Sequence, residues 1–318
     1  MKAPGFWYRE PGLGAALLSP LSALWAIGAR RRAARPCQRV PIPVICVGNL
    51  TVGGTGKSPT VMALVEMCRA RGVEPHILSR GYGGSVAGPV AVTAQMTADE
   101  VGDEPVMLRD FAQVWVARDR LAGAQAAAEE GAQTLILDDG FQDPSLCKDL
   151  SILVVDAETG FGNGRLLPAG PLRERVADGV ARADLALMIG QGDGPSLPLP
   201  TARGRIEPLR TGMPWAGLPV VAFAGIGRPE KVFATLRGLG VDLKAAHGFG
   251  DHAPYTPAIL SRLEAEARRH GAQLVTTEKD AARLPADFRA KVLPLAVRLH
   301  LHDGTALETA LDRVLAPS

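Results

Sequence analysis

The chain contains 318 residues, of which 47% are hydrophobic and 21% charged, and its formal net charge is +2. A chain of this length and composition can bury a full core, and we expect two domains. The sequence contains no internal repeat or low-complexity tract, and we expect no nucleic-acid partner.

Residues 1–40 differ from the rest of the chain in charge. They contain seven basic residues and one acidic residue. A basic arm of this kind indicates an anionic partner near the N-terminus. The alternative is charge that only keeps a chain end soluble.

The same segment combines aromatic, apolar and basic elements. The run Phe6-Trp7-Tyr8 precedes leucines at near-helical spacing, and Arg30-Arg31-Arg32 follows them. The apolar part is interrupted by Pro20 and is shorter than the about 20 residues that cross a bilayer. A basic cluster after the apolar run does not fit a signal peptide. We therefore predict a helix that lies on a membrane surface, with its arginines against anionic lipid. The alternative is a helix packed on the protein's own core.

The four cysteines (Cys37, Cys46, Cys68 and Cys147) form no C-x-x-C pair. This spacing argues against a zinc site and against a disulfide framework. Cys46 and Cys68 fall on apolar faces, where we expect buried thiols. The cysteines therefore predict a reducing, cytoplasmic compartment.

A glycine-rich loop lies between a predicted strand at Val44–Val47 and a predicted helix at Ser58–Arg71. Such a loop turns backbone N–H groups toward phosphate oxygens, and the helix dipole favours the same anion. Lys57 is expected at the β- and γ-phosphates, and the Ser58 hydroxyl at Mg²⁺. The predicted nucleotide-binding residues are Thr51, Val52, Gly53, Gly54, Thr55, Gly56, Lys57 and Ser58. Thr51 stands where the usual G-x-x-x-x-G-K-[ST] pattern has its first glycine. The alternative is a chance glycine-rich turn.

Short apolar runs alternate with helical patterns over residues 41–190. Such alternation predicts a parallel sheet with helices on both faces, and this fold class is α/β of the P-loop NTPase type. Glycines and prolines break the periodicity over residues 191–219, which predicts a linker. A smaller α/β domain is expected over residues 220–318. The predicted strands are 44–47, 76–78, 90–92, 114–117, 134–137, 152–155, 185–189, 220–224 and 273–276, and the best-defined helices are 58–71, 105–110, 119–130, 257–269 and 305–315.

Carboxylates follow or precede several of these elements. Asp138 and Asp139 end a predicted strand, where P-loop enzymes keep an Mg²⁺-binding carboxylate. Adjacent residues of an extended strand point to opposite sides, so only one can face the metal unless the chain has already turned. Asp103 and Glu104 precede a short helix. On spacing alone, a helix cap explains Asp103 better than a role as the base for an attacking hydroxyl, which is the alternative. His252 follows Asp251 in a loop of the second domain, where a surface pair is the plainer interpretation.

Arginines occur in two glycine- and proline-rich loops. Arg80 belongs to Ser79-Arg80-Gly81-Tyr82-Gly83, and Arg173 to Leu167-Pro168-Ala169-Gly170-Pro171-Leu172-Arg173-Glu174. Arginine suits a phosphate ligand, although loop arginines are usually solvated.

Together these motifs resemble the tetraacyldisaccharide 4′-kinase family, also called the lipid A 4′-kinases. The resemblance covers roughly residues 1–285. Its motifs are Val47-Gly48-Asn49-Leu50-Thr51-Val52-Gly53-Gly54-Thr55-Gly56-Lys57-Ser58-Pro59, Ser79-Arg80-Gly81-Tyr82-Gly83, Gly102-Asp103-Glu104-Pro105, Leu137-Asp138-Asp139-Gly140-Phe141-Gln142, Leu167 to Glu174, Asp251-His252 and Thr276-Thr277-Glu278-Lys279-Asp280. Thr51 is itself a feature of that family. The chain departs from the family at Arg175, where proline is common, and at Ala253, where a second histidine is common.

The resemblance implies transfer of the γ-phosphate of ATP to the 4′-hydroxyl of a tetraacyldisaccharide 1-phosphate, an anionic glycolipid of lipid A synthesis. It implies a peripheral or monotopic enzyme at the cytoplasmic face of the bacterial inner membrane. It further implies Asp103 as the base, His252 as its support and Lys57 as the phosphate ligand. Ser58 with Asp138 or Asp139 would bind Mg²⁺, assisted by Glu104, and Arg80 or Arg173 would bind the 1-phosphate.

Two other functions remain open at the level of the sequence. The first is a cytosolic small-molecule kinase or ligase, which would not need the apolar N-terminus. The second is a membrane-bound NTPase switch or metallochaperone, in which the motifs around Asp103 and His252 would have no purpose. The sequence indicates no obligate protein partner.

Overall fold

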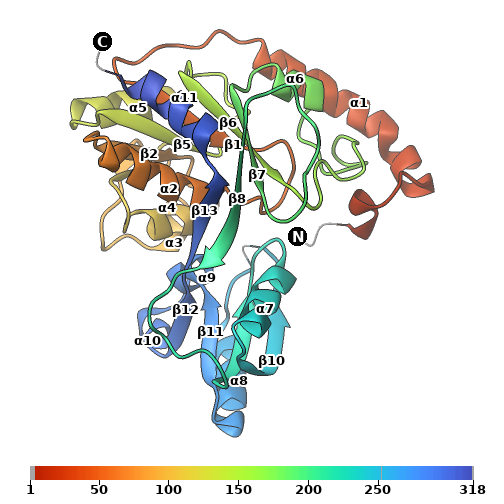
Figure 1. Ribbon diagram of the computed structural model, residues 1–318, viewed down its shortest axis with the longest axis vertical. Helices are drawn as coiled ribbons and strands as arrows, with labels where there is room; N and C mark the ends of the chain where they lie inside the picture. The colour runs from red at the N-terminus through yellow and green to blue at the C-terminus, as the bar shows by residue number, and fades with distance from the viewer. Residues whose placement is uncertain (1–3, 252, 317–318) are drawn as a thin grey trace.

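The computed structural model describes residues 4–251 and 253–316, and Figure 1 shows a large domain above a smaller one. The large domain contains a nine-stranded sheet with the order β13-β8-β7-β6-β1-β5-β2-β4-β3. All neighbouring pairs are parallel except β13 with β8 and β3 with β4. The predicted α/β class is confirmed. The strands are β1 (Val44–Gly48), β2 (Pro75–Ser79), β3 (Val90–Ala91), β4 (Val114–Val116), β5 (Thr134–Asp138), β6 (Leu150–Asp156), β7 (Leu185–Ile189), β8 (Thr201–Pro208) and β13 (Val297–Asp303).

Helices cover both faces of this sheet because its central strands are apolar on both sides. On one face α2 (Lys57–Ala70), α4 (Asp103–Leu108) and α11 (Thr305–Leu315) bury their apolar sides in one core. On the other face α5 (Arg120–Glu129) packs through its alanines, and α6 (Val176–Val180) packs against the same apolar cluster. The short α3 (Ala98–Val101) leads into α4. The carboxyl ends of β1, β2 and β5 therefore meet at one edge, where the predicted motifs lie.

The smaller domain contains a four-stranded parallel sheet with the order β10-β9-β11-β12. Its helices bury two apolar clusters, one on each face of that sheet. The strands are β9 (Pro219–Ala224), β10 (Asp242–Gly248), β11 (Gln273–Thr277) and β12 (Val292–Leu295), and the helices are α7 (Pro229–Gly238), α8 (Pro257–His270), α9 (Glu278–Ala282) and α10 (Ala286–Arg289).

The domain boundaries differ from the prediction at both ends of the smaller domain. The expected linker over 191–219 contains β8, which pairs with β7 and β13 in the large sheet. After β12 the chain returns to the large domain as β13 and α11, so 220–318 is not one domain. The helix at 305–315 forms as predicted, but Leu307 and Leu311 are buried in the core of the large sheet. The smaller domain therefore occupies residues 209–296, between β8 and β13.

The N-terminal helix α1 (Leu13–Ala33) continues through Pro20 for 21 residues. Among the described residues, it is the one helix whose length and composition would allow it to cross a membrane. The expectation that its apolar part is too short is therefore wrong. One side touches the protein: the Ser22 hydroxyl donates to the Leu166 carbonyl (2.9 Å), and Trp25 Nε1 donates to the Arg173 carbonyl (2.7 Å). The other side exposes large apolar side chains, namely Leu13, Leu17, Leu21, Leu24 and Ile27. Before it, Trp7 of η1 (Gly5–Tyr8) is buried and donates to the Pro168 carbonyl.

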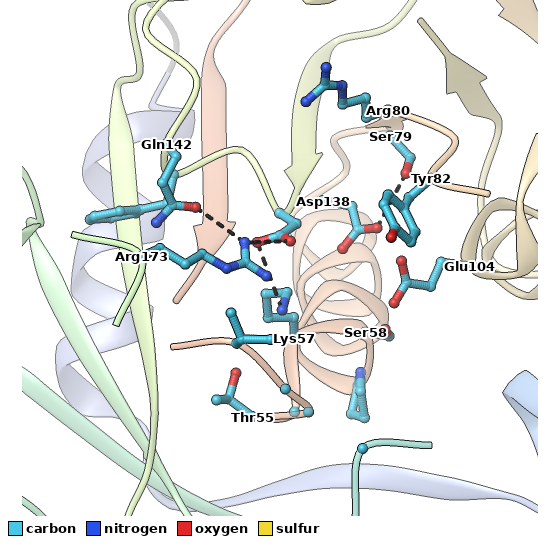
Figure 2. Close-up of a pocket in the computed structure, with 18 of the residues that line it drawn as sticks. Thr55, Lys57, Ser58, Ser79, Arg80, Tyr82, Glu104, Asp138, Gln142 and Arg173 are labelled. Carbon is cyan, nitrogen blue, oxygen red and sulfur yellow. Dashed lines mark hydrogen bonds and ion pairs between the residues drawn. The ribbon is translucent and has the colours of Figure 1, made fainter. Parts of the chain in front are cut away.

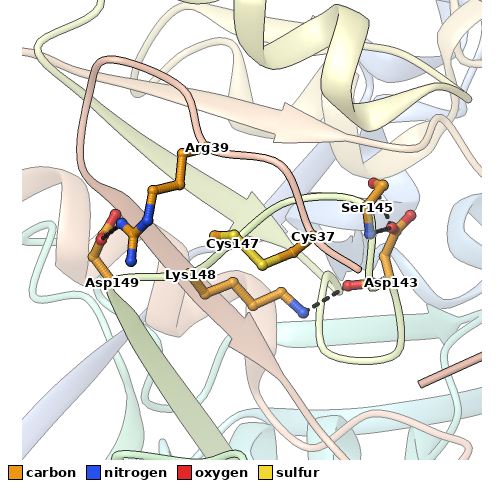
Figure 3. The surroundings of a disulfide bond; sticks show 7 residues. All are labelled: Cys37, Arg39, Asp143, Ser145, Cys147, Lys148 and Asp149. Atoms are coloured by element: carbon orange, nitrogen blue, oxygen red, sulfur yellow. Dashed lines mark hydrogen bonds and ion pairs between the residues drawn. A yellow bond between two sulfur atoms is a disulfide. The ribbon is translucent and has the colours of Figure 1, made fainter. Parts of the chain in front are cut away.

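A disulfide joins Cys37 to Cys147 (Figure 3), so the expectation of four reduced cysteines is wrong for this pair. The backbone brings them together. Gln38 donates to the Ser145 carbonyl (2.9 Å) and accepts from Cys147 N (3.0 Å), which leaves the two cysteine Cα atoms 4.9 Å apart. Cys46 and Cys68 are buried free thiols, as predicted.

Candidate nucleotide and phosphate-transfer site

The glycine-rich loop joins β1 to the first turn of α2, as the sequence predicts. Gly53 and Gly56 have φ angles of 119° and 95°, a region that favours glycine, so the loop needs glycine at both positions. The side chain of Asn49 stabilises the loop: its Nδ2 atom donates to Thr55 Oγ1 (3.0 Å), and its Oδ1 atom accepts from Lys57 Nζ (3.4 Å). The helix N-terminus and its open N–H groups therefore face the cavity as an anion site.

Thr51 occupies the place of the usual first glycine without strain. It forms an isolated antiparallel bridge with Leu172, and Val52 N donates to the Pro171 carbonyl (2.8 Å). Any residue can adopt an extended bridge of this kind, so glycine is not required here. This bridge also attaches the loop that carries Arg173 to the phosphate-binding loop.

Asp138 and Asp139 both reach the site because the chain turns between them. Asp139 has a φ of 50°, the left-handed region, whereas Asp138 is the last residue of β5. Ser79 Oγ donates to the Asp138 carboxylate (3.4 Å). Arg173 Nη1 donates to both oxygens of Asp139 (3.0 and 2.9 Å), and Lys57 Nζ lies 3.7 Å from the same carboxylate. Figure 2 shows Ser79, Asp138, Arg173 and Lys57 near the start of α2.

The two carboxylates differ in proton affinity. Burial raises the pKa of Asp138 to about 7, and the like charges of Glu104 and Asp139 add to this shift. Burial also raises the pKa of Asp139, but Lys57 and Arg173 outweigh it and lower that pKa to about 2. Lys57 and Arg173 thus hold Asp139 in its ionised form. Burial and the neighbouring carboxylates favour the protonated form of Asp138, so a bound cation would stabilise the Asp138 carboxylate.

A divalent metal ion fits this donor set. The Ser58 hydroxyl and the carboxylates of Glu104 and Asp138 line the same cavity, which has a volume of about 1980 Å³. In the described part of the chain, no three histidine, cysteine, aspartate or glutamate side chains form a metal-binding group. A few hard oxygen ligands with phosphate and water completing the shell are typical of Mg²⁺ rather than of zinc or calcium.

Asp103 is the first residue of α4, and Gly102 is the cap residue, so a helix cap does not explain Asp103. Its side chain is 4% exposed. Lys279 Nζ and Arg283 Nε, both from the smaller domain, lie 3.8 and 3.7 Å from its Oδ2 atom. The smaller domain therefore closes against the carboxylate that the family resemblance implies as the base.

Several predicted residues have other outcomes. Arg80 is exposed at the rim of the cavity and points away from Lys57 (Figure 2), whereas Arg173 lies inside the site. His252 lies outside the described residues, so its support of Asp103 stays a prediction. Its neighbour Asp251 lies 3.7 Å from Lys279 Nζ.

Sequence reasoning assigned no role to three cationic residues of the site. Arg120 is 3% exposed, and its Nη2 atom donates to the carbonyls of Asp138 (3.1 Å) and Asp139 (3.0 Å), which fixes the turn between them. Lys279 and Arg283 are the others. Arg120 follows the carboxyl end of β4, the position where ligands of parallel sheets gather, and this was the available signal.

Comparisons with known proteins agree with this geometry. The family model described as tetraacyldisaccharide-1-P 4′-kinase matches residues 14–316. The tetraacyldisaccharide 4′-kinase of Dinoroseobacter shibae is 56% identical over 98% of this chain and 97% of that protein, and the one of a Jannaschia species is 52% identical over 99% of each. A crystal structure of LpxK from Aquifex aeolicus, an "apo" form in complex with ATP, superposes with a TM-score of 0.78 at 28% identity, covering 95% of this chain and 99% of that one.

Proposed function

Because the chain belongs to the tetraacyldisaccharide-1-P 4′-kinase family, we propose that it transfers the γ-phosphate of ATP to the 4′-hydroxyl of a tetraacyldisaccharide 1-phosphate in lipid A biosynthesis. The protein is therefore a phosphotransferase. One observation carries the proposal: the phosphate-binding loop, the Asp138–Asp139 turn and Glu104 line one cavity at the carboxyl edge of the sheet. Asp103 adjoins Glu104 at the start of α4, and the two carboxylates lie 3.8 and 3.1 Å from Lys279 Nζ.

Each group of the site has a chemical role in this proposal. The N–H groups at the start of α2 and the ammonium of Lys57 bind the β- and γ-phosphates. Bound Mg²⁺ would neutralise charge on those phosphates, held by Ser58, Asp138 and Glu104. Arg173 and Lys57 fix the Asp139 carboxylate beside them. Asp103 receives the proton of the attacking hydroxyl, so the sugar oxygen gains electron density as it bonds to phosphorus and ADP leaves.

The smaller domain supports the chemistry by covering the phosphate-binding loop. Gly227 approaches so closely that a Cβ there would lie 3.1 Å from Gly54 N. Such a lid limits access of water, which competes with the sugar hydroxyl for the γ-phosphate.

The exposed apolar side of α1 supports a membrane site for the reaction. Leu13, Leu17 and Leu24 are 85%, 80% and 68% exposed, and Arg30, Arg31 and Arg32 end the same helix. Apolar side chains beside arginines suit the boundary between acyl chains and anionic headgroups. Because ATP is supplied in the cytoplasm, we place this contact at the cytoplasmic face of the inner membrane.

The decisive experiment measures transfer of labelled γ-phosphate from ATP to tetraacyldisaccharide 1-phosphate in mixed micelles. Labelled lipid with the wild type and none with Lys57→Ala supports the proposed reaction. ATP turnover without labelled lipid would remove the glycolipid acceptor and favour an NTPase switch.

The membrane contact is tested with vesicles of anionic phospholipid. Leu17→Asp with Leu21→Asp places charge on the exposed side of α1 and leaves Ser22 and Trp25 in place. We expect the wild type to sediment with the vesicles and the double variant to stay in solution. Equal sedimentation of both proteins would refute the assignment of this surface.

A further inference from the structure

The segment Thr277-Glu278-Lys279-Asp280 at the start of α9 has no part in the phosphate-binding loop, yet each of its side chains is engaged. Thr277 Oγ1 accepts from Asp280 N (3.0 Å) and so caps the helix. Glu278 binds Arg298 at the start of β13 (3.1 and 3.0 Å). The segment is therefore held on one side by its own helix cap and on the other by the strand that returns to the large domain.

Asp280 organises the neighbourhood of this segment. It is fully buried, accepts from Gly225 N (3.1 and 3.0 Å) and from the Tyr255 hydroxyl (2.9 Å), and binds the Arg283 guanidinium. Arg283 Nη2 also donates to the Gly225 carbonyl (3.0 Å). Because these contacts fix the orientation of the guanidinium, Asp280 also determines the direction of Arg283 Nε.

Lys279 and Arg283 both point out of the smaller domain toward α4. Lys279 Nζ lies 3.1 Å from Glu104 Oε1 and 3.8 Å from Asp103 Oδ2, and Arg283 Nε lies 3.7 Å from the same Asp103 atom. The side chains of Lys279 and Arg283 are only 17% and 11% exposed. Charge pairs removed from water interact more strongly than exposed pairs, so these contacts constrain both carboxylates.

We propose that Lys279 is a positioning residue for phosphate transfer: with Arg283 beside it, its ammonium sets the orientation of Asp103 and Glu104 and balances their charge. The inference rests on the proposed function. Asp103, Glu104 and Asp138 bring carboxylates together where a triphosphate must also bind, and mutual repulsion would turn them apart without cations between them. Because Lys279 belongs to the smaller domain, the carboxylates reach their working arrangement only when the two domains are in contact.

A plain domain latch is the competing explanation, and the chain offers a matched control for it. Lys231 of α7 also reaches from the smaller domain to the large one, where its Nζ atom lies 2.9 Å from Asp156 and 3.1 Å from Glu158. Replacing Lys231 or Lys279 removes an ion pair between the domains. Only the Lys279 change alters the surroundings of Asp103 and Glu104.

The test compares Lys279→Gln, Lys279→Arg and Lys231→Gln with the wild type by kcat, by KM for ATP and by thermal unfolding. A misplaced catalytic group costs on the order of 10² in rate. We therefore expect Lys279→Gln to lower kcat about 100-fold with KM for ATP changed by less than about threefold. Lys279→Arg should recover at least about tenfold of that loss, because it keeps the cation, and Lys231→Gln should keep kcat within about threefold.

Other outcomes overturn the inference. A kcat for Lys279→Gln near that of the wild type would contradict the positioning role. Equal losses of kcat in Lys279→Gln and Lys231→Gln would show that Lys279 only holds the two domains together. If Lys279→Gln unfolds, the arginine variant decides: a loss of about 100-fold in that folded variant contradicts a role based on positive charge. Wild-type lipid labelling is measured separately. Its failure would reject the proposed acceptor, while the same ratios of kcat for ATP turnover would still decide the role of Lys279.

Discussion

Replacing Asp138 by asparagine is expected to stabilise the metal-free protein at pH 8 while abolishing phosphate transfer. Asp138 is 2% exposed, and its burial beside Glu104 and Asp139 raises its pKa to about 7. In the unfolded chain the pKa of an aspartate is about 3.9. The folded protein therefore binds this proton more tightly than the unfolded chain, and losing it opposes folding.

The size of the effect follows from the shift in pKa. A shift of about three units corresponds to about 4 kcal/mol, since each unit is worth about 1.4 kcal/mol. Part of this cost comes from repulsion that Asp138 shares with the other carboxylates. We therefore expect the free energy of unfolding to be about 2 kcal/mol higher in the variant. For a chain of this size, that corresponds to an increase of about 4 °C in Tm. The stability of the wild type should decline as pH rises from about 4 to about 7 and then level off. The variant lacks this contribution.

Thermal unfolding at pH 5, 6, 7 and 8, with a chelator and again with Mg²⁺, measures this prediction. Mg²⁺ should raise the Tm of the wild type and leave that of Asp138→Asn unchanged. Asp139→Asn is the matched control. The pKa of Asp139 is lowered to about 2 despite its burial, because Lys57 and Arg173 favour the charged form, so its neutralisation should lower Tm at pH 8. A Tm of Asp138→Asn at or below that of the wild type at pH 8, or a difference independent of pH, would refute the reasoning.

Three further outcomes are expected. Asp103→Ala should lower kcat by on the order of 10²–10⁴ with ATP affinity intact, as measured by nucleotide titration, and a rate near that of the wild type would exclude Asp103 as the base. Lys57→Ala should weaken both ATP binding and turnover. If the variant keeps both, Lys57 is not the phosphate ligand. Reducing the Cys37–Cys147 bond should speed trypsin cleavage after the exposed Arg39 by about tenfold, because only a short backbone bridge and an ion pair then hold that segment. Cys37→Ser without reductant should behave as the reduced protein does, and unchanged cleavage would count against this reasoning.

The parts of the fold that local patterns determine could be predicted from the sequence. The helix after the phosphate-binding loop was expected at Ser58–Arg71 and is observed at Lys57–Ala70. Its apolar period and the preceding glycines lie within one short stretch, so no distant contact was needed. The central strands β1, β2 and β4 to β7 of the large sheet followed for the same reason: they are short, buried runs bounded by turn residues.

Features that depend on distant segments could not be predicted. Helix α11 has the expected bounds, but an apolar stripe does not say which of two sheets it covers. Strand β8 contains Arg203, Gly204 and Arg205, and it forms because β7 and β13 flank it rather than because of an apolar pattern. The pairing of Cys37 with Cys147 spans 110 positions. Of the site, the groups on the P-loop and β5 were predictable, whereas Lys279 reaches α4 only through the arrangement of the two domains.

The return of the chain through β13 makes the smaller domain an insertion into the large one. Pro208 at the end of β8 is the register partner of Val297 at the start of β13, and Leu209 N donates to the Ala296 carbonyl (2.9 Å). The points where the chain leaves and re-enters are thus neighbours across one antiparallel ladder, an arrangement that tolerates gain or loss of a whole module. A tight hairpin joining Pro208 to Val297 would therefore leave the order of the large sheet intact.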